Sequence, residues 1–197
     1  MEIFIMNNQN NPTKVRIPCR ISYANLFVPK AVDPKSDPKY SVVCLIDKKD
    51  TETVKKVKAA IALAVEQGKE KYWSGKLPAK CKMALHDGDI DRPDDEAYAG
   101  HYFVNANSSD KPQVVDRRKN PIEDPMDVYS GCYCNVTVNF YPYNKPMNQG
   151  IATGLGNVQF VRDGERLSGR ASANEDFDVL EDDDDMGVLD ELPDYLQ

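Results

Sequence analysis

Residues 129–143 contain two interleaved sets of side chains that repeat with a period of two. The first set is small or apolar: Cys132, Cys134, Val136, Val138 and Phe140. The second set has tyrosines near its ends and amide or hydroxyl groups between them: Tyr133, Asn135, Thr137, Asn139 and Tyr141. Because successive side chains of a strand point to opposite faces, this stretch is predicted to be a β-strand with one buried face and one polar, aromatic face.

The polar face of this strand is typical of a surface that holds nucleic acid bases. Aromatic rings separated by small hydrogen-bonding groups form a platform on which unstacked bases can lie. A sheet face covered by an ordinary loop has the same composition, so the strand alone leaves both interpretations open. The candidates for stacking are Tyr102, Tyr129, Tyr133 and Tyr141, and the candidates for polar contacts are Asn105, Asn135 and Asn139.

Other stretches have the alternation or the β-branched content of strands, namely residues 14–27, 40–46, 98–107, 113–116 and 151–161. One strong helix is predicted to begin at Asp50 or Thr51 and to fade near Gly68, because apolar residues recur there at three- and four-residue spacing. Pro18 favours a sheet edge or a bulge for the first strand. Five or six strands with one main helix predict a mainly β domain, folded as a small Greek-key barrel.

The net charge of −7 is unevenly distributed. Residues 171–197 hold eleven acidic residues and no Lys or Arg, which leaves 25 basic and 21 acidic residues in residues 1–170, a net of +4. A segment as polar as the last one cannot bury enough apolar surface to fold alone. We predict a flexible leader at residues 1–13, a basic domain at 14–172 and a disordered acidic tail at 173–197.

Basic side chains on the predicted outer faces and turns are candidates for contacts with phosphate groups: Arg16, Arg20, Lys39, Arg117 and Arg118. Such contacts supply the salt-dependent part of nucleic acid binding. Most surface charges serve solubility alone. The agreement in sign along the outer face of residues 14–27 favours the phosphate interpretation.

The acidic tail ends in apolar side chains, which suits docking into a basic-rimmed apolar pocket on another protein. The candidates for this contact are Asp182, Asp183, Asp184, Asp185, Asp190, Glu191, Asp194, Tyr195 and Leu196. A flexible chain of this length spans about 30 Å, so it can also reach back over the domain and compete with DNA for the basic face. Solubility alone is the alternative interpretation of such a tail.

No motif in the sequence supports catalysis. The chain has no phosphate-cradling glycine loop, no nucleophile elbow and no His-Glu-Xaa-Xaa-His pattern. Asp87, Asp89 and Asp91 alternate as divalent-cation ligands do in a calcium loop or a nuclease, but Arg92 and Tyr98 stand where a calcium loop needs glycine and glutamate. We therefore predict a polar surface loop over residues 86–96, with no metal site and no cofactor.

The location of the protein is predicted from what the sequence contains. Its five cysteines are an odd number, mostly in apolar runs, which predicts reduced thiols rather than disulfides. No apolar stretch has the roughly 18 residues of a membrane span, and the first residues lack the pattern of a signal peptide. These features predict a soluble intracellular protein with no membrane partner.

A series of short motifs resembles a bacteriophage family that was long catalogued as a domain of unknown function and is now regarded as single-stranded-DNA-binding. The motifs are residues 22–27 (Ser-Tyr-Ala-Asn-Leu-Phe), 38–41, 92–95, 98–103, 105–107, 129–133 and 154–158. That family is similar to the replication single-stranded-DNA-binding proteins of short-tailed phages. The resemblance implies an OB-fold-like barrel, an acidic tail that contacts replication enzymes, and a homodimer. Those phage proteins end in phenylalanine, whereas this chain ends in Tyr-Leu-Gln.

The residues and the resemblance together predict a non-catalytic single-stranded-DNA-binding protein of phage replication or recombination. It is expected in the cytoplasm of the bacterial host, where it coats exposed strands and recruits replication or recombination proteins through its tail. Two rival functions stay open. One is a metal-dependent nuclease that uses Asp87, Asp89 and Asp91, and the other is an acidic mimic of DNA that inhibits a host protein.

Overall fold

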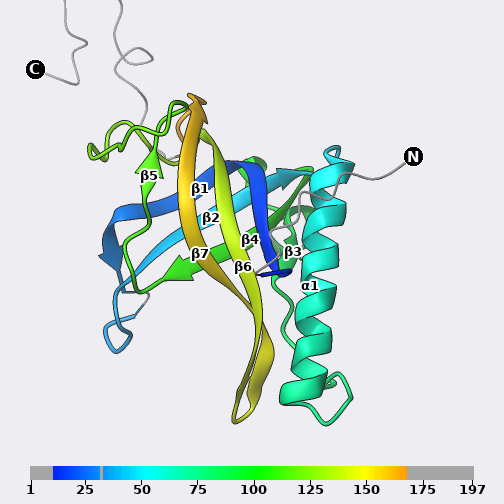
Figure 1. Cartoon of the computed structure of the whole chain (residues 1–197). Helices are drawn as coiled ribbons and strands as arrows, with labels where there is room; N and C mark the ends of the chain where they lie inside the picture. The colour runs from blue at the N-terminus through cyan, green and yellow to red at the C-terminus, as the bar shows by residue number, and fades with distance from the viewer. Residues whose placement is uncertain (1–10, 32, 168–197) are drawn as a thin grey trace, which may run out of the picture.

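Seven strands and two helices make up the described part of the chain, residues 11–31 and 33–167 of a computed structural model (Figure 1). The long strands are β1 (Lys14–Lys30), β2 (Lys39–Asp47), β4 (His101–Ser108), β6 (Tyr133–Lys145) and β7 (Asn148–Arg162). The short strands are β3 (Leu85–Asp87) and β5 (Val114–Val115). The helices are α1 (Thr51–Lys71), α2 (Gly88–Asp91) and the 3-10 turn Glu96–Tyr98.

The five long strands close into a barrel. Neighbouring strands follow the order β3-β4-β2-β1-β6-β7-β5, and a further pairing of β4 with β7 closes the ring. That closing contact is parallel, with Asn107 opposite Gly154, whereas the other pairs within the barrel are antiparallel. The predicted mainly β fold with one main helix and an OB-fold-like barrel is confirmed.

β1 is long because its first part pairs with β6 and its second part pairs with β2. Its first half, which includes Pro18, pairs only with β6, and pairing with β2 begins at Arg20. Pro18 therefore lies where β1 has a free edge, as expected for a residue without an N–H group. Between Ser22 and Asn25 the register shifts, and Tyr23 has a φ of 45°. This bulge bends β1 within the part that pairs with β2.

The apolar set of β6 lies inside the barrel, as its alternation predicted. Cys134, Val136, Val138 and Phe140 are all buried there, and so is Cys19 opposite Cys134 on β1. Burial raises the pKa of the Cys19 and Cys134 thiols. All five cysteines are free thiols.

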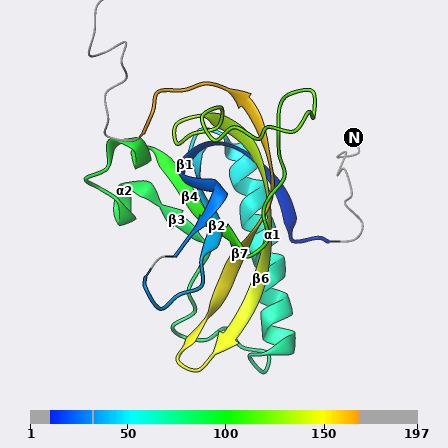
Figure 2. The same cartoon turned by 90° about the vertical axis from the view of Figure 1, so that its left-hand side faces the viewer.

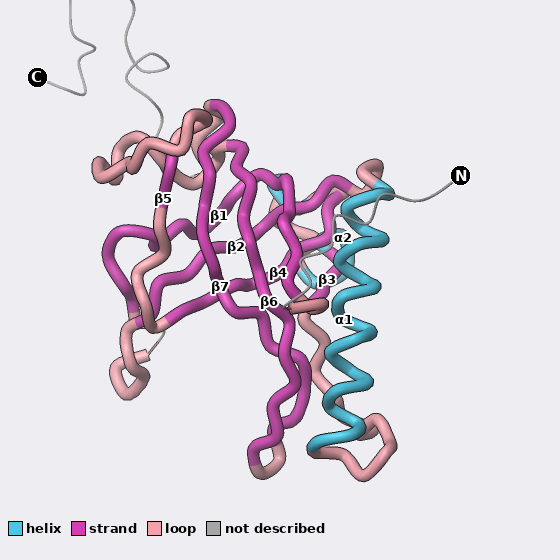
Figure 3. The backbone as a smooth tube through the Cα atoms, in the orientation of Figure 1, coloured by secondary structure: helices cyan, strands magenta, loops and turns pink. Residues whose placement is uncertain are grey.

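α1 lies against β6 and the first half of β1 and completes the core (Figure 3). Asp50 begins the helix because its carboxylate accepts a hydrogen bond from the Thr53 N–H at 3.0 Å. Val57 and Ala64 are fully buried on its inner face. At its end the Trp73 ring packs directly on Gly68, where a Cβ atom would lie 2.4 Å from the ring.

The first part of the predicted surface loop over residues 86–96 has regular structure, because β3 ends at Asp87 and α2 spans Gly88–Asp91. Lys48 bonds to both Asp87 and Asp89, with 2.7 Å between Nζ and the Asp89 carboxylate. These bonds raise the pKa of Lys48, and the ammonium group lowers the pKa of Asp89. The lysine thus stands between two of the three carboxylates proposed as metal ligands. Within residues 11–31 and 33–167, no three His, Cys, Asp or Glu side chains are arranged to hold a metal ion.

None of the helices in the described part of the chain is both long and apolar enough to cross a bilayer.

Candidate nucleic-acid interface

One row of outward-facing side chains crosses the barrel from strand to strand. The strand register places Arg162 of β7 opposite Tyr133 of β6, and Tyr133 opposite Arg20 of β1. The row continues from Arg20 to Leu45 of β2 and from Leu45 to Phe103 of β4. These five residues are distant in sequence and become neighbours through strand pairing alone.

Only part of this row is open to solvent. Leu45 and Phe103 are buried beneath Tyr98 and Leu167. Tyr133 is half-buried, and Arg162 is exposed. The open part of this row is therefore formed by β1, β6 and β7. We call it the β1–β6–β7 face and define it by Arg16, Arg20, Tyr133, Asn135, Gln159 and Arg162.

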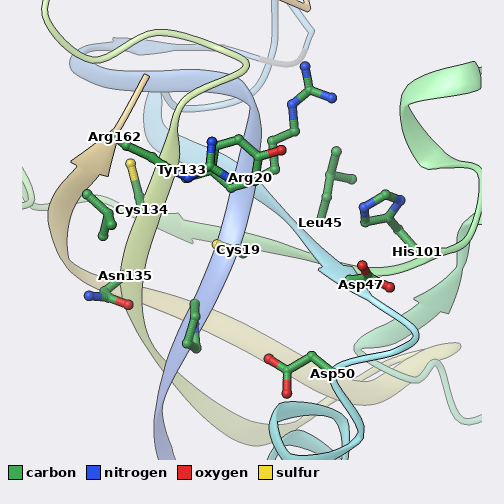
Figure 4. A pocket seen from close by; sticks show the side chains of 12 residues that line it. Cys19, Arg20, Leu45, Asp47, Asp50, His101, Tyr133, Cys134, Asn135 and Arg162 are labelled. Carbon is green, nitrogen blue, oxygen red and sulfur yellow. The ribbon is translucent and has the colours of Figure 1, made fainter. Parts of the chain in front are cut away.

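Tyr133 is the centre of this face, since arginines of both neighbouring strands approach its ring (Figure 4). The guanidinium carbon of Arg162 lies 3.4 Å from the ring centroid, and that of Arg20 lies 6.0 Å from it. Planar cations next to an aromatic ring are attracted by its π electrons. The result is a flat, positively charged group of side chains at the surface.

A hollow of about 300 Å³ opens beside Tyr133. Its walls near Tyr133 are cationic and apolar, with Arg20, Arg162 and Leu45. Figure 4 shows two carboxylates, Asp47 and Asp50, farther from the tyrosine. An anionic ligand is therefore favoured at the arginine side of the hollow and disfavoured at the aspartate side.

Arg20 has a second role, because backbone carbonyl groups accept its hydrogen bonds. Its Nε donates to the Gly131 oxygen at 3.2 Å, and its Nη2 donates to the Glu165 oxygen at 2.8 Å. Gly131 has a φ of 121°, and a Cβ atom there would lie 2.0 Å from the Glu165 oxygen. Arg20 thus holds residues 163–167 against the barrel, and its charge contributes to the face from a fixed position.

The amide groups of the face form a chain of hydrogen bonds toward its edge. Asn135 donates to the Gln159 side chain at 3.1 Å, and Gln159 donates to the Asp116 carbonyl at 3.4 Å. Asp116 begins the turn that carries Arg117 and Arg118, both exposed. The hydrogen bonds from Asn120 hold the pKa of the Asp116 carboxyl below its usual value. This turn brings two predicted phosphate candidates to the rim beyond β7.

Four predicted residues lie on the outer surface but farther away. Asn139 accepts a hydrogen bond from the Thr13 hydroxyl at 2.8 Å, and the exposed Tyr141 ring lies over Gly154. Both continue along β6 from Tyr133. Asn105 is exposed on β4, and Lys39 is exposed at the start of β2.

Two predicted tyrosines lie elsewhere. Tyr102 is on the inner side of β4 with Val104 and Ala106, and its ring lies 4.9 Å from the Lys48 ammonium and 5.1 Å from that of Lys58. It therefore faces away from Asn105, its predicted partner in binding.

Tyr129 lines a separate hollow of about 680 Å³. Its hydroxyl donates to Asp163 at 2.8 Å, and the Arg166 guanidinium carbon lies 3.9 Å from its ring centroid. Burial and the neighbouring Asp163 carboxylate raise the pKa of Tyr129 to about 12. This tyrosine helps to hold residues 163–167 and does not share the face of Tyr133.

Sequence reasoning missed Arg162 and Gln159. Neither belongs to a motif, and the polar side of residues 151–161 gave no sign of which strand it would lie beside. The only signal was the position of Arg162 at the end of a predicted strand.

Known proteins resemble this chain in sequence. The sequence model of a family described as the ssDNA-binding protein of Enterobacter phage Enc34 matches residues 13–187. The chain belongs to this family. A relative of this chain, putative protein p50 of Acyrthosiphon pisum secondary endosymbiont phage 1, is 33% identical over 169 residues, which cover 82% of this chain and 90% of the relative.

Solved structures extend the likeness. The single-stranded DNA-binding protein from bacteriophage Enc34, in complex with ssDNA, superposes with a TM-score of 0.65 and 26% identity over 78% of this chain and 88% of that chain. The single-stranded DNA-binding protein gp2.5 of bacteriophage T7 superposes with a TM-score of 0.51 and 18% identity over 81% of this chain and 97% of that one. The second likeness shows the fold alone. The predicted family is confirmed, and the T7 protein shares its fold.

The predictions for the two ends of the chain concern residues that the structure does not describe. They concern the leader, apart from its last few residues, and the acidic tail with its partner-binding residues from Asp182 to Leu196. The boundaries 1–13, 14–172 and 173–197 stay predictions.

Proposed function

We propose that this chain binds single-stranded DNA on the β1–β6–β7 face and catalyses no reaction on it. The observation that carries the proposal is the Tyr133 ring, which has Arg162 at 3.4 Å and Arg20 at 6.0 Å and lies beside a hollow with cationic and apolar walls. A flat ring with planar cations offers stacking to a base and charge to the adjacent phosphate. The solved complex of the related Enc34 protein with ssDNA supports this assignment.

Stacking and charge would have separate sources on this face. Stacking of a base on an aromatic ring contributes about 1–3 kcal/mol and tolerates any sequence. Arg16 on β1, together with Arg117 and Arg118 at the rim, would supply phosphate contacts, since all three are exposed. The Asn135–Gln159 pair would hydrogen-bond to whatever base lies above it.

The strand path would follow β6. Tyr133 and Tyr141 are both on its outer side, and eight residues at about 3.4 Å each separate them by about 27 Å. Asn135 and Asn139 lie between these rings on the same side. A polynucleotide that follows this strand would therefore meet rings at both ends and amide groups in the middle.

The acidic tail would regulate this binding. Its eleven carboxylates are the only long run of one charge in the chain, and a flexible segment attached to the domain has a local concentration of about millimolar. It would compete with DNA for the basic face and, once displaced, bind replication or recombination proteins. The proposed setting is phage DNA replication or recombination in the cytoplasm of the bacterial host, and a homodimer is part of this proposal.

A titration of a labelled oligonucleotide tests the interface. Tyr133→Ala should weaken binding of a short single strand about tenfold, which is the loss of about 1.4 kcal/mol of stacking. Tyr72→Ala is the matched control, because Tyr72 is an exposed tyrosine beyond α1 and off the proposed face. Equal affinity of Tyr133→Ala and the original protein, with both folded by circular dichroism, would reject this interface.

The same titration distinguishes the proposed function from its rivals. Duplex DNA and RNA at two salt concentrations report the strand preference, and deletion of residues 175–197 should strengthen binding most at low salt. A nuclease would shorten the labelled strand in the presence of Mg²⁺. The pairing of Asp87 and Asp89 with Lys48 speaks against that outcome. A DNA mimic would bind a host protein and ignore the oligonucleotide.

A further inference from the structure

One end of the molecule carries a group of exposed lysines, with the exposed Glu70 of α1 at its border. The end of α1, the loop that follows it and the β6–β7 hairpin all lie there in both views (Figures 1 and 2). We call this surface the lysine end and define it by Lys71, Lys76, Lys80, Lys82 and Lys145. Residues 71–84 and 141–150 contain no Asp or Glu. None of the five lysines forms an ion pair with another residue of the described chain.

The lysine end is fixed by the backbone. The Lys82 N–H donates to the Gln149 oxygen at 2.9 Å, and the Ile151 N–H donates to the Lys82 oxygen at 2.9 Å. Gly150 allows this approach, because a Cβ atom there would lie 2.4 Å from the Lys82 oxygen. The loop and the hairpin are thus joined, so their lysines have a defined arrangement.

Apolar side chains are exposed between these lysines. Tyr72, Leu77 and Met83 follow α1, and Met147 lies at the tip of the hairpin. Leucine and methionine offer no flat surface to a base, whereas they do pack against leucine and tyrosine side chains. The combination of lysines and aliphatic side chains fits an acidic peptide with apolar anchors better than it fits a polynucleotide.

The chain itself contains a peptide of that composition. Residues 175–197 hold eleven carboxylates and no Lys or Arg, and they end with the apolar anchors Val188, Leu189, Leu192, Tyr195 and Leu196. The lysine end is complementary to this segment in both charge and apolar character.

The position of the tail's origin favours a second copy of the chain. The described chain ends at Leu167, whose N–H donates to the Ser130 oxygen beyond the C-terminal end of β7. The lysine end is at the opposite end of β7, and the 15 residues of this strand span roughly 50 Å. If the tail is flexible as proposed, its 30 residues would span about 30 Å root-mean-square.

We propose that residues 175–197 of one copy bind the lysine end of the next copy. A tail at one end and its acceptor at the other make a head-to-tail contact, which repeats along a line and is separate from the contact that would close the proposed homodimer. The contact depends on the proposed function in one respect. A DNA strand on the β1–β6–β7 face would displace the tail from its own copy and make it available to the neighbour, so assembly would follow strand binding.

Complementary variants of the full chain test the contact on a long oligo(dT) that holds several copies. The acceptor variant carries Lys76→Glu, Lys80→Glu and Lys82→Glu. The donor variant carries Asp182→Asn, Asp183→Asn, Asp184→Asn and Asp185→Asn. The matched control is Lys49→Glu with Lys55→Glu near the start of α1, where both side chains are exposed. Mass photometry counts the copies on each strand.

A copy of the original protein should bind a site beside an occupied one more tightly than an isolated site. In each variant alone, the ratio of these two affinities should fall roughly tenfold, since several ion pairs of up to about 1 kcal/mol are reversed or removed. The two variants mixed should form pairs, because one supplies a tail and the other a lysine end. The control should behave as the original protein. Full arrays of the acceptor variant, or no pairs in the mixture, would overturn the proposal.

A short oligonucleotide that holds one copy separates this inference from the proposed function. The acceptor variant should bind it with unchanged affinity, since its lysines are off the β1–β6–β7 face. Failure of every form to bind it would reject the proposed function and leave the tail contact to be tested without DNA.

That second test uses Cys81, which is half-buried between Lys80 and Lys82, whereas the other four cysteines are buried. Copies of two different masses that carry Tyr195→Cys are mixed and treated with a bismaleimide. We expect crosslinks to Cys81 between copies, absent after Cys81→Ser. Crosslinks only within one copy, or crosslinks that survive Cys81→Ser, would reject the head-to-tail contact.

Discussion

The guanidinium carbon of Arg162 lies 3.4 Å from the centre of the Tyr133 ring, and the two residues are directly opposite each other on β6 and β7. One face of the ring is therefore covered by a planar cation in the absence of any ligand. A base that binds here either extends the stack over the guanidinium or displaces it. In the proposed complex, Arg162 would then lie within reach of the phosphate that follows that base.

Arg162 should contribute to binding through both its shape and its charge. We expect Arg162→Ala to weaken the affinity for a short single strand about tenfold, from a cation–π contact of roughly 0.5–1 kcal/mol and a lost phosphate contact. Arg162→Lys keeps the charge without the planar group, so its loss should be smaller. Fluorescence anisotropy measures both. An Arg162→Lys variant as weak as Arg162→Ala would show that charge contributes little here.

Arg16 should act on the salt dependence of binding. It is exposed on the outer side of β1, opposite Thr137 on β6, and has no ion pair within residues 11–31 and 33–167. Arg16→Gln should reduce the slope of log affinity against log salt by about 0.7, the value for one phosphate contact on a single strand. Lys55→Gln on α1 is the control. A slope equal to that of the control would remove Arg16 from the interface.

Gly131 should be essential for the position of residues 163–167. Gly131→Ala places a Cβ atom 2.0 Å from the Glu165 oxygen at a φ of 121°, so it should cost about 1–3 kcal/mol of unfolding free energy in urea. Gly100→Ala is a matched control, because Gly100 also has a positive φ, 69°, but nothing within 4 Å of its Cβ position. Similar losses in the two variants would show that backbone strain alone, and not the contact with Glu165, is responsible.

Asp89 should make stability depend on pH in the acid range. Lys48 and the Gly100 N–H lower its pKa, so its contribution is present above the unfolded value of about 3.9 and is lost as the pH falls through the lowered folded value. Asp89→Asn should therefore lower Tm at pH 7, and the difference should shrink below about pH 4. Asp94→Asn, at an exposed side chain, is the control. A difference that persists at pH 2 would mean that charge at Asp89 is not the cause.

Much of the fold follows from local patterns. The alternation of Cys134, Val136 and Val138 with polar residues predicted both faces of β6, and the start of α1 was predicted at Asp50 or Thr51, of which Asp50 is the cap. Pro18 was expected at an edge and lies where β1 has one partner strand. Each of these properties depends on a residue and its immediate neighbours, so the sequence contains the information directly.

The candidate site was predicted less completely, because strand partners are distant in sequence. The alternation of residues 98–107 already places Tyr102 and Asn105 on opposite faces of the strand. Only the closed barrel decides that Tyr102 is on the inner face and Asn105 on the outer one. The spacing of Asp87 and Asp89 resembles that of metal ligands. In the structure, however, the turn after β2 places Lys48 between them, where it pairs with both. Arg162 became a neighbour of Tyr133 only through the register of β6 and β7.

By itself, the sequence determined the barrel class, the buried side of β6 and of the first part of β1, the start of α1 and the separation of charge between the domain and its last residues. The tertiary structure alone decided which tyrosines share a face, which arginines reach Tyr133 and which lysine pairs with Asp87. The reason is physical. Side-chain alternation and helix capping act over a few residues, whereas the register between paired strands depends on the packing of the whole barrel.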